Sequence, residues 1–240
     1  TMPSASASAP FCAVLLLFLP GVIGMSMSAG RKQQRVLCLH GSGGSAENFL
    51  KQLAPLRNAL SASMPLIEWE FEALDAPDGR WWTYPQGERS YTASAYQGDD
   101  VSIDAVEAAL ARNDFVGIIG FSQGAMLAAI VVARALLSEG SEETSLRFAV
   151  LSGAAVPKPY EALLQQLADT TGTTLPTLHT LSKMDTMNPP DMGEWVASCF
   201  APSAKVLWHG AGHTIAPEAC LSEVVEFVSA ATSKKANDVK

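Results

Sequence analysis

Residues 120–124 of this chain read Gly-Phe-Ser-Gln-Gly, and this G-x-S-x-G pattern constrains the fold more than any other segment. The apolar run 115–119 precedes it, and residues 125–133, which are apolar throughout, follow it. Such a pattern places its serine on a tight, strained turn between a strand and a helix, where side chains at the glycine positions would collide with neighbouring backbone. The simpler interpretation is a glycine-rich turn whose serine caps a helix. The apolar flanks favour the first interpretation, which makes Ser122 a nucleophile held on a strand-to-helix elbow.

The chain from Arg35 onwards alternates short apolar runs with longer helical patterns, which is typical of a parallel sheet covered by helices on both faces. The expected strands are Arg35–His40, Glu68–Leu74, Phe115–Phe121, Arg147–Ser152, Pro176–Leu181 and Lys205–His209. The second of them alternates apolar and polar residues, which is typical of a strand nearer an edge. The expected helices are Ala46–Ala59, Ser102–Ala111, Gln123–Leu137, Tyr160–Ala168, Asp191–Cys199 and Pro217–Ala231.

The pattern predicts three parts along the chain. Residues 1–30 form an N-terminal extension, which is either signal-like or untranslated. Residues 31–232 contain no internal repeat and no long linker, so we expect them to form one α/β domain. Residues 233–240 carry three lysines and no apolar periodicity, so we expect a disordered tail.

The cellular location depends on the N-terminal extension. Its apolar run Phe11–Ile23 is too short to cross a bilayer as a helix, so no stable membrane span is expected. The run has the length of a signal-peptide core, but no Lys or Arg precedes it, and translation from Met25 or Met27 explains the sequence equally well. We expect a cytoplasmic protein, or a secretory or organellar one where residues 1–24 are translated.

The composition argues against two classes of site. With 16 Lys and Arg against 24 Asp and Glu, the formal net charge is −8, and the basic residues are scattered. A nucleic-acid-binding protein needs a basic stripe to neutralise phosphates, so we expect no nucleic-acid partner. The four cysteines are too few and too widely spaced for a disulfide framework or a zinc site, so no metal is expected. Cys38 lies in an apolar run, where a thiol usually behaves as a small inert hydrophobe.

A serine hydroxyl becomes an effective nucleophile when an imidazole accepts its proton, and this chain has four histidines. His213 follows a run of small residues beyond the last strand, so its side chain can lie over the carboxyl edge of the sheet, where α/β proteins bind ligands. His209 ends that strand and is the second choice. His179 falls within a strand and reads as a hydrogen-bonded core residue, and His40 belongs to a His-Gly pair with a different role. We expect His213 to be the base.

The third member of a triad orients the imidazole and stabilises its charged form. Asp185 lies four residues beyond the strand that ends at Leu181, again at the carboxyl edge. Asp191 reads better as a helix-initiating residue after two prolines, and Asp75 as a turn residue. The order Ser122, Asp185, His213 is that of the α/β-hydrolase fold.

The negative oxygen that forms during acyl transfer needs backbone donors. One is expected to be the N–H of Gln123, which follows the nucleophile at a helix N-terminus whose dipole favours negative charge. The other is expected in the loop 39–45, Leu-His-Gly-Ser-Gly-Gly-Ser, where the N–H of Ser42 is the candidate. A plain glycine-rich turn and a phosphate-binding loop are the alternatives. The segment matches neither G-x-x-x-x-G-K-[ST] nor G-x-G-x-x-G, so a nucleotide is not expected.

With these residues in place, the chain resembles the FSH family of serine hydrolases. The resemblance covers residues 35 to about 230 and rests on five segments, namely RVLCLHGSGGSAENF, LDAP with Arg80-Trp81-Trp82, FVGIIGFSQGAMLAA, Leu175–Pro189 and HGAGH. It places Ser122, Asp185 and His213 on the family's triad positions. Family members usually have a glycine three residues before the acid and a proline three residues after the histidine. Here Ser182 stands at the first position, and Pro217 is one place late.

The resemblance implies hydrolysis of small carboxylic esters through an acyl-enzyme, without a metal or an organic cofactor. Some relatives are thioesterases, so a thioester of coenzyme A or of an acyl carrier is the alternative substrate for the same serine. A hydrolase-like binding protein without catalysis belongs to another class, and the complete triad argues against it. A serine peptidase would need room for an extended chain.

The resemblance and the spacing together predict a small, open site. Only residues 123–184 and 186–212 separate the three triad members, which leaves little room for a large lid domain. Trp81, Trp82 and Tyr84 are candidates for the substrate pocket, because aromatic side chains supply apolar area around a ligand. A structural aromatic cluster is an equal alternative for each of them.

Overall fold

The structure is a computed structural model, and it describes Thr1 and residues 31–233 except residues 113, 139–143, 171–172 and 216. The predicted N-terminal extension, apart from Thr1, and the tail residues 234–240 lie outside the described residues. Ser233 was expected in the tail, but it is the last residue of a helix.

Six parallel strands form one sheet in the order β2-β1-β3-β4-β5-β6. The strands are β1 (Lys32–Leu39), β2 (Ile67–Leu74), β3 (Phe115–Phe121), β4 (Phe148–Ser152), β5 (Thr177–Ser182) and β6 (Ala204–His209). All six correspond to predicted strands, and β2 lies at an edge, as its alternating pattern predicts. Because every pair is parallel, the carboxyl ends of all six strands lie at the same edge of the sheet.

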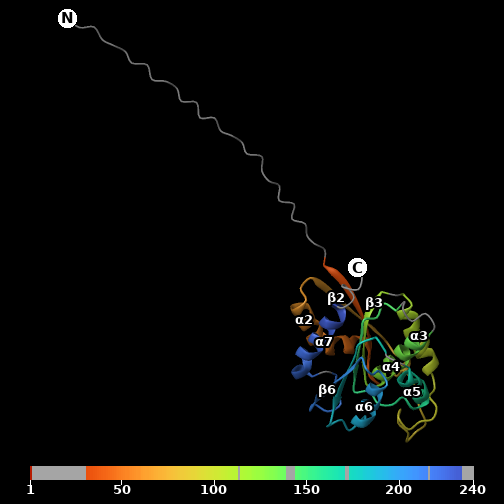
Figure 1. The fold of residues 1–240 in the computed structure, drawn as a ribbon. Coiled ribbons are helices and arrows are strands. Elements are labelled where there is room, and N and C mark those ends of the chain that lie inside the picture. The colour runs from red at the N-terminus through yellow and green to blue at the C-terminus, as the bar shows by residue number, and fades with distance from the viewer. Residues whose placement is uncertain (2–30, 113, 139–143, 171–172, 216, 234–240) are drawn as a thin grey trace. The chain divides into compact units, whose positions relative to one another are not determined.

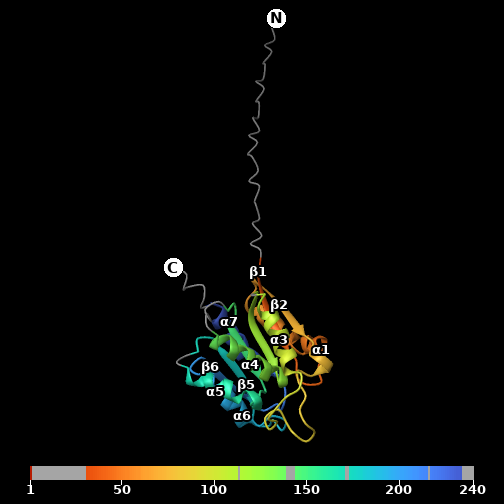
Figure 2. The same ribbon diagram turned by 90° about the vertical axis from the view of Figure 1, so that its right-hand side faces the viewer.

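Helices cover both faces of this sheet, as Figures 1 and 2 show. Helices α1, α2 and α7 pack on one face, and α3, α4, α5 and α6 pack on the other. Their bounds are α1 (Ala46–Gln52), α2 (Ala54–Ser63), α3 (Asp99–Leu110), α4 (Gln123–Leu137), α5 (Glu161–Asp169), α6 (Pro190–Ser198) and α7 (Leu221–Ser233). The predicted fold class, a parallel sheet between two helical layers, is confirmed.

The helix predicted over Ala46–Ala59 is in fact two helices. Helix α1 ends before Leu53, and α2 begins after it with Pro55 in its first turn. A proline has no N–H to donate to the preceding turn, so it interrupts one helix while fitting the start of another. Helix α7 likewise begins at Leu221, after the short 3₁₀ turn Glu218–Cys220, rather than at Pro217.

Helix α4 is the central element of the core. Residues Gln123 to Ala133 of this helix are all buried, which agrees with the uniformly apolar sequence of residues 125–133. The neighbouring strands are buried as well, and Cys38 in β1 has no exposed surface. Burial raises the pKa of the Cys38 thiol, so it stays protonated and inert. The residue before α4 is Ser122, which is therefore held at the start of a buried helix.

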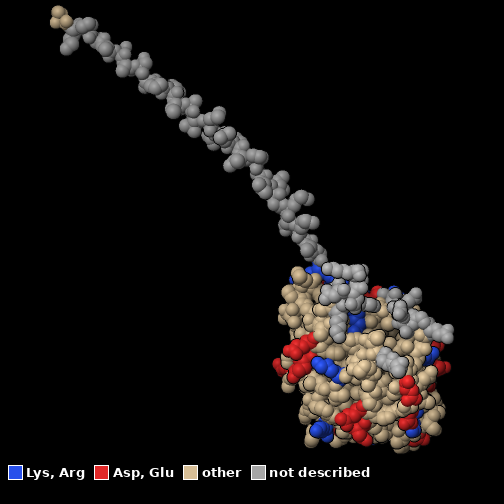
Figure 3. Space-filling model, in the orientation of Figure 1, with Lys and Arg blue, Asp and Glu red and all other residues tan. Residues whose placement is uncertain are grey.

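Charged side chains are dispersed over the domain face drawn in Figure 3, where acidic and basic residues are interspersed. Among the residues that the structure describes, no helix has the length and apolar character needed to cross a membrane.

Candidate active site

Ser122 lies between β3 and α4 with a φ of 54° and a ψ of −119°. A non-glycine residue in this region costs about 1–3 kcal/mol and persists only where its surroundings fix it. A Cβ atom on Gly120 would lie 2.5 Å from the carbonyl oxygen of Gly124, and one on Gly124 would lie 2.2 Å from the carbonyl oxygen of Leu39. Any larger residue at either position would collide with neighbouring backbone, as the G-x-S-x-G pattern predicts.

The predicted serine, acid and histidine meet at the carboxyl edge of the sheet. His213 Nε2 lies 2.9 Å from Ser122 Oγ, and His213 Nδ1 lies 2.7 Å from Asp185 Oδ2. A carboxylate accepts hydrogen bonds, so the ring proton belongs on Nδ1 and Nε2 is left to accept the proton of Ser122. Ser122 follows β3, Asp185 follows β5 and His213 follows β6, so three different strand ends supply the three groups.

The loop after β5 holds the Asp185 carboxylate in place. Its Oδ1 atom accepts hydrogen bonds from the backbone N–H groups of Met187 at 2.8 Å and Asn188 at 2.9 Å. The Asn188 side chain donates in turn to the carbonyl oxygen of Gly153 at 2.7 Å. Only 4% of the Asp185 side chain is exposed. Because Oδ1 is occupied by the loop's own backbone, Oδ2 is the oxygen left for His213.

Ser182 connects the loop after β5, which carries Asp185, to the loop after β6, which carries His213. Its Oγ accepts hydrogen bonds from the backbone N–H of Met184 and from that of Gly212, each at 3.1 Å. Met184 precedes the acid Asp185, and Gly212 precedes the base His213. The side chain is buried. The serine that departs from the family's usual glycine thus contributes a hydrogen-bonding group between the two loops.

His40 has the separate role that its His-Gly context suggests. Its Nε2 accepts a hydrogen bond from the backbone N–H of Ala76 at 3.1 Å, and its Nδ1 lies 2.7 Å from the carbonyl oxygen of Gly41. The carbonyl oxygen of His40 accepts from Trp81 Nε1 at 2.7 Å. His40 therefore connects the loop after β1 to the loop after β2.

His179 and His209 do not contact the nucleophile. His179 is buried in β5, its Nε2 lies 3.1 Å from Thr177 Oγ1, and burial lowers its pKa to about 3. His179 is thus the core residue that its place in a strand predicts. His209 Nδ1 accepts from the backbone N–H of Ala211 at 3.2 Å, and partial burial lowers its pKa.

The two rival acids also lie elsewhere. Asp191 is exposed in the first turn of α6, as its position after two prolines predicts. Asp75 follows β2, and its Oδ1 accepts a hydrogen bond from the backbone N–H of Ala46 at 2.7 Å. Asp75 thereby fixes the start of α1. Within the described parts of the chain, no three His, Cys, Asp or Glu side chains are grouped so as to hold a metal ion.

Ser122 opens onto a cavity of about 350 Å³, which we call the Ser122 cavity. Its lining includes both predicted oxyanion donors, Ser42 and Gln123, together with His213. Neither the Ser42 nor the Gln123 backbone N–H donates to another described residue. A Cβ atom on Gly41 would lie 3.3 Å from Ser122 Cβ, so the loop after β1 passes directly beside the nucleophile. Two free backbone amides that line the cavity beside the nucleophile are the kind of donors that an oxyanion requires.

The three predicted pocket aromatics divide into two kinds. Trp82 and Tyr84 line the Ser122 cavity, whereas Trp81 does not. Trp81 is buried, and its backbone N–H donates to Gln123 Oε1 at 3.0 Å. Gln123 Nε2 donates to the carbonyl oxygen of Trp82 at 2.9 Å. The Gln123 side chain therefore holds the Trp81-Trp82 segment, and Trp81 lies outside the lining of the Ser122 cavity.

A second cavity, of about 520 Å³, lies on the other side of Phe121 and His213. It is lined by the junction of α1 and α2, by β3 and β4, and by residues 213–215 with Glu218 and Leu221. Ser122 is not among its lining residues, and the ring of Phe121, 4.9 Å from that of His213, borders both cavities. The reacting carbonyl therefore belongs in the Ser122 cavity.

The structure predicts that Gly124→Ala destabilises the protein. The new Cβ would lie 2.2 Å and 2.5 Å from the carbonyl oxygens of Leu39 and His40, which are backbone atoms and cannot turn aside. We expect the free energy of unfolding to fall by about 3 kcal/mol, at the upper end of overpacking effects. Urea denaturation followed by circular dichroism measures this change. Gly210→Ala is the matched control, because a Cβ there meets no atom within 4 Å. Equal urea midpoints for the two variants would contradict the prediction.

The chain was compared with protein families and with curated proteins. The family model described as "Serine hydrolase (FSH1)" matches residues 27–220. The human protein named Esterase OVCA2 is 31% identical over 216 residues, which cover 78% of this chain and 91% of the human protein. Esterase GA18864 of Drosophila pseudoobscura pseudoobscura is 32% identical over 198 residues, covering 75% of this chain and 65% of the fly protein.

Solved structures resemble the fold at low sequence identity. The crystal structure of esterase PE8 has a TM-score of 0.63 at 19% identity, covering 84% of this chain and 94% of that one. Acyl-protein thioesterase 2 of Zea mays has a TM-score of 0.61 at 19% identity, covering 84% of this chain and 95% of that one. These likenesses show the α/β-hydrolase fold and, at such identities, the fold alone.

Proposed function

The chain belongs to the FSH1 family of serine hydrolases, as its motifs predict, and we propose that it hydrolyses small carboxylic esters through an acyl-enzyme formed on Ser122. The observation that carries this proposal is the continuous chain of contacts from Asp185 Oδ2 through the His213 ring to Ser122 Oγ. Each contact has hydrogen-bond length, and each group follows a different strand.

In the first half of the reaction, Ser122 Oγ attacks the ester carbonyl carbon. His213 Nε2 takes the hydroxyl proton as the new C–O bond forms, and Asp185 stabilises the imidazolium that results. The tetrahedral intermediate then collapses, the bond to the alcohol oxygen breaks, and His213 gives its proton to the departing alcohol. The acyl group remains on Ser122.

In the second half, water replaces the alcohol. His213 removes a proton from the water as its oxygen bonds to the acyl carbon, and the proton then passes to Ser122 Oγ as the acyl-oxygen bond breaks. The free acid leaves. In both halves the negative carbonyl oxygen lies against the N–H groups of Gln123 and Ser42, and each such donor is worth about 3–4 kcal/mol in the transition state.

The proposal is tested by covalent labelling. A fluorophosphonate probe at neutral pH should label the protein to about one equivalent, and mass spectrometry of a digest should place the adduct on Ser122. Pre-steady-state assays with p-nitrophenyl butyrate should release p-nitrophenol in a burst of similar size wherever hydrolysis of the acyl-enzyme is the slower step. A folded protein that neither reacts with the probe nor hydrolyses esters would instead be a binding protein with a hydrolase fold.

A further inference from the structure

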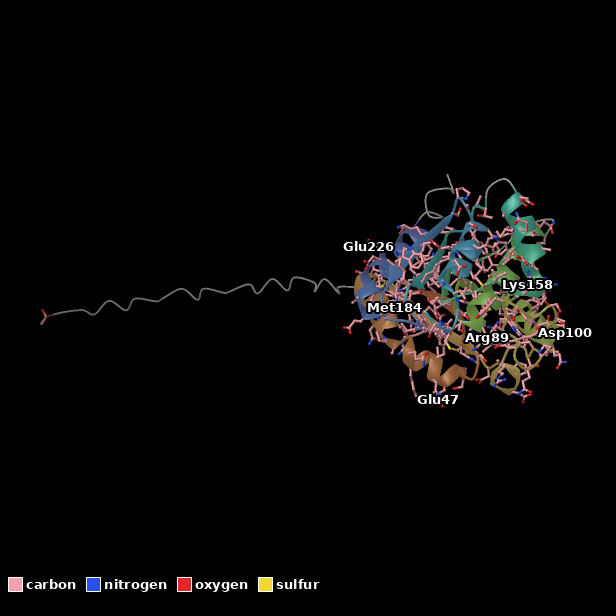
Figure 4. All side chains as sticks on the ribbon, turned by 90° about the horizontal axis from the view of Figure 1, so that it is seen from below. Glu47, Arg89, Asp100, Lys158, Met184 and Glu226 are labelled. Atoms are coloured by element: carbon pink, nitrogen blue, oxygen red, sulfur yellow. The ribbon has the colours of Figure 1, made fainter. Side chains whose placement is uncertain are left out.

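The Ser122 cavity has an apolar floor and a cationic mouth. Trp82 and Met126 are 2% exposed and form part of its inner wall beside Ser122. Arg80 and Arg89 also line the cavity, but both are exposed, so their side chains lie where it opens to solvent. Figure 4 views the molecule from below and labels Arg89 among its side chains.

No carboxylate lines the Ser122 cavity, although the chain as a whole carries a net charge of −8. Arg35, Arg112 and Arg134 each form an ion pair with an Asp or Glu. For Arg80 and Arg89, by contrast, no ion pair with a carboxylate occurs within the described residues. The Ser122 cavity is therefore lined by two arginines with which no carboxylate of the described residues forms an ion pair.

The backbone at Arg80 is held in place by the active site. Its N–H donates to the carbonyl oxygen of Pro77 at 3.0 Å, and the carbonyl oxygen of the preceding Gly79 accepts from Gly43 at 2.7 Å. The following residue, Trp81, is hydrogen-bonded to the Gln123 side chain. The backbone on one side of Arg80 is thus hydrogen-bonded to the loop after β1, which contains Ser42. The backbone on its other side is hydrogen-bonded to Gln123, the first residue of α4.

The backbone at Arg89 is held equally well. Its carbonyl oxygen accepts from Thr92 N–H at 2.9 Å, and the next residue, Ser90, accepts from Trp82 Nε1 at 3.3 Å and from Tyr96 Oη. The Tyr96 ring stacks on Trp82 at 4.7 Å. The two guanidinium groups therefore extend from fixed backbone, which reduces the entropy lost when they bind a ligand.

We propose that Arg80 and Arg89 bind an anionic group, a carboxylate or a phosphate, carried by the ester substrate. This inference rests on the proposed function and specifies its substrate class. Arginine matches both groups, because its planar fork donates two parallel hydrogen bonds to a pair of oxygens. The apolar floor takes the part of the substrate next to the carbonyl, and the anion lies at the mouth.

The position of the anion indicates which part of the substrate carries it. After acylation the leaving group must depart before water can attack, so it occupies the open mouth, and the acyl group occupies the closed floor. A phosphate on the leaving group meets the arginines directly. A carboxylate at the far end of a short acyl chain reaches the same mouth only if the chain turns back, so the leaving-group arm of the test should show the larger effect.

The test uses two matched substrate pairs and two variants. In the acyl arm, p-nitrophenyl hydrogen glutarate is compared with its neutral methyl ester. In the leaving-group arm, butyryl-coenzyme A is compared with the neutral butyryl thioester of N-acetylcysteamine. Both pairs are assayed with the wild type, with the Arg80→Gln/Arg89→Gln double variant and with Arg57→Gln, an exposed arginine of α2 outside the Ser122 cavity.

We expect the wild type to prefer the anionic member in at least one arm by about tenfold or more in kcat/KM, since hydrogen bonds between charged groups are stronger than those between neutral ones. The double variant should lose this preference mainly through KM and keep its activity on the neutral substrates, while Arg57→Gln should retain the preference. Arg→Lys at both positions should restore part of it, and added salt should weaken it.

Three results would overturn the inference. They are equal rates within both pairs for the wild type, a preference that survives in the double variant, and an equal loss in Arg57→Gln. In each of these the neutral esters are still hydrolysed, so the proposed function stands. A wild-type protein that hydrolyses none of the four compounds overturns the proposed function and this inference together.

Discussion

Ser122→Ala is expected to lower kcat for p-nitrophenyl butyrate by at least about 10⁴-fold, since removal of the nucleophile leaves only the contribution of the oxyanion donors and of binding. Loss of one oxygen atom also removes the partner that lies 2.9 Å from His213 Nε2. The fold should be unaffected, because Ser122 Oγ makes no hydrogen bond besides that one among the described residues. Relief of the strained backbone is not expected, because alanine at a φ of 54° is as strained as serine.

The measurement is steady-state hydrolysis combined with fluorophosphonate labelling, and with circular dichroism to show that the variant is folded. Ser222→Ala is the matched control, since Ser222 is an exposed serine of α7 whose Oγ donates to Glu223 Oε2. The control should be labelled and should turn over substrate as the wild type does. Undiminished labelling of the Ser122→Ala protein would remove Ser122 from the mechanism.

Asp185→Asn is expected to lower kcat by about 10³–10⁴-fold with little change in KM. The asparagine amide would donate a hydrogen bond where the carboxylate accepts one, so His213 Nδ1 would become the acceptor and the ring proton would move to Nε2. A protonated Nε2 cannot take the proton of Ser122, although every heavy atom keeps its place. The second cause is the loss of negative charge beside the imidazolium, at a site that is 4% exposed.

Asp191→Asn is the control for this variant, because Asp191 is the neighbouring acid that the sequence offered as a rival and is exposed on α6. The pH dependence of kcat/KM separates the loss of the general base from the loss of the folded structure. Hydroxide at high pH should recover part of the activity of Asp185→Asn, whereas a merely unfolded variant would not recover. If Asp191→Asn lost activity and Asp185→Asn did not, the assignment of the acid would be wrong.

The fold was predictable because the inner strands β3, β4 and β5 are buried on both faces. Short apolar runs such as Phe115–Phe121 can form little else between two helical patterns, and the alternation in Glu68–Leu74 identified an edge strand. Helix boundaries were less predictable, because they depend on single residues. Pro55 divides one expected helix into two, and nothing in the apolar pattern of that region records the break.

The three triad positions could be predicted from the sequence because the parallel sheet brings all carboxyl strand ends to one edge. The groups that hold them were missed. Asn188, Ser182 and the side chain of Gln123 act through hydrogen bonds to backbone atoms that are distant in sequence, such as Gly153 and Gly212. Such bonds depend on how loops meet in space. The one sign of these groups in the sequence was Ser182, which stands where family members usually have glycine.

The sequence also could not show which of the two adjacent tryptophans, Trp81 or Trp82, lines the cavity. The pair Trp81-Trp82 looks uniform in sequence, and either ring could line a pocket. In the structure the two rings point to different surroundings, because Trp81 donates to the backbone of His40 and Trp82 to Ser90. Only the second ring reaches the Ser122 cavity. Adjacent residues in an irregular segment have no fixed periodicity that would assign them to one face.

The Ser182 hydroxyl is hydrogen-bonded both to the loop that carries the acid Asp185 and to the loop that carries the base His213. Its Oγ accepts one hydrogen bond from the backbone N–H of Met184, next to Asp185, and one from that of Gly212, next to His213. A displacement of either loop is therefore transmitted to the other. The nucleophile stands outside this coupling, anchored to α4. The triad thus combines a nucleophile at the start of α4 with an acid and a base whose two loops are hydrogen-bonded to one shared oxygen atom.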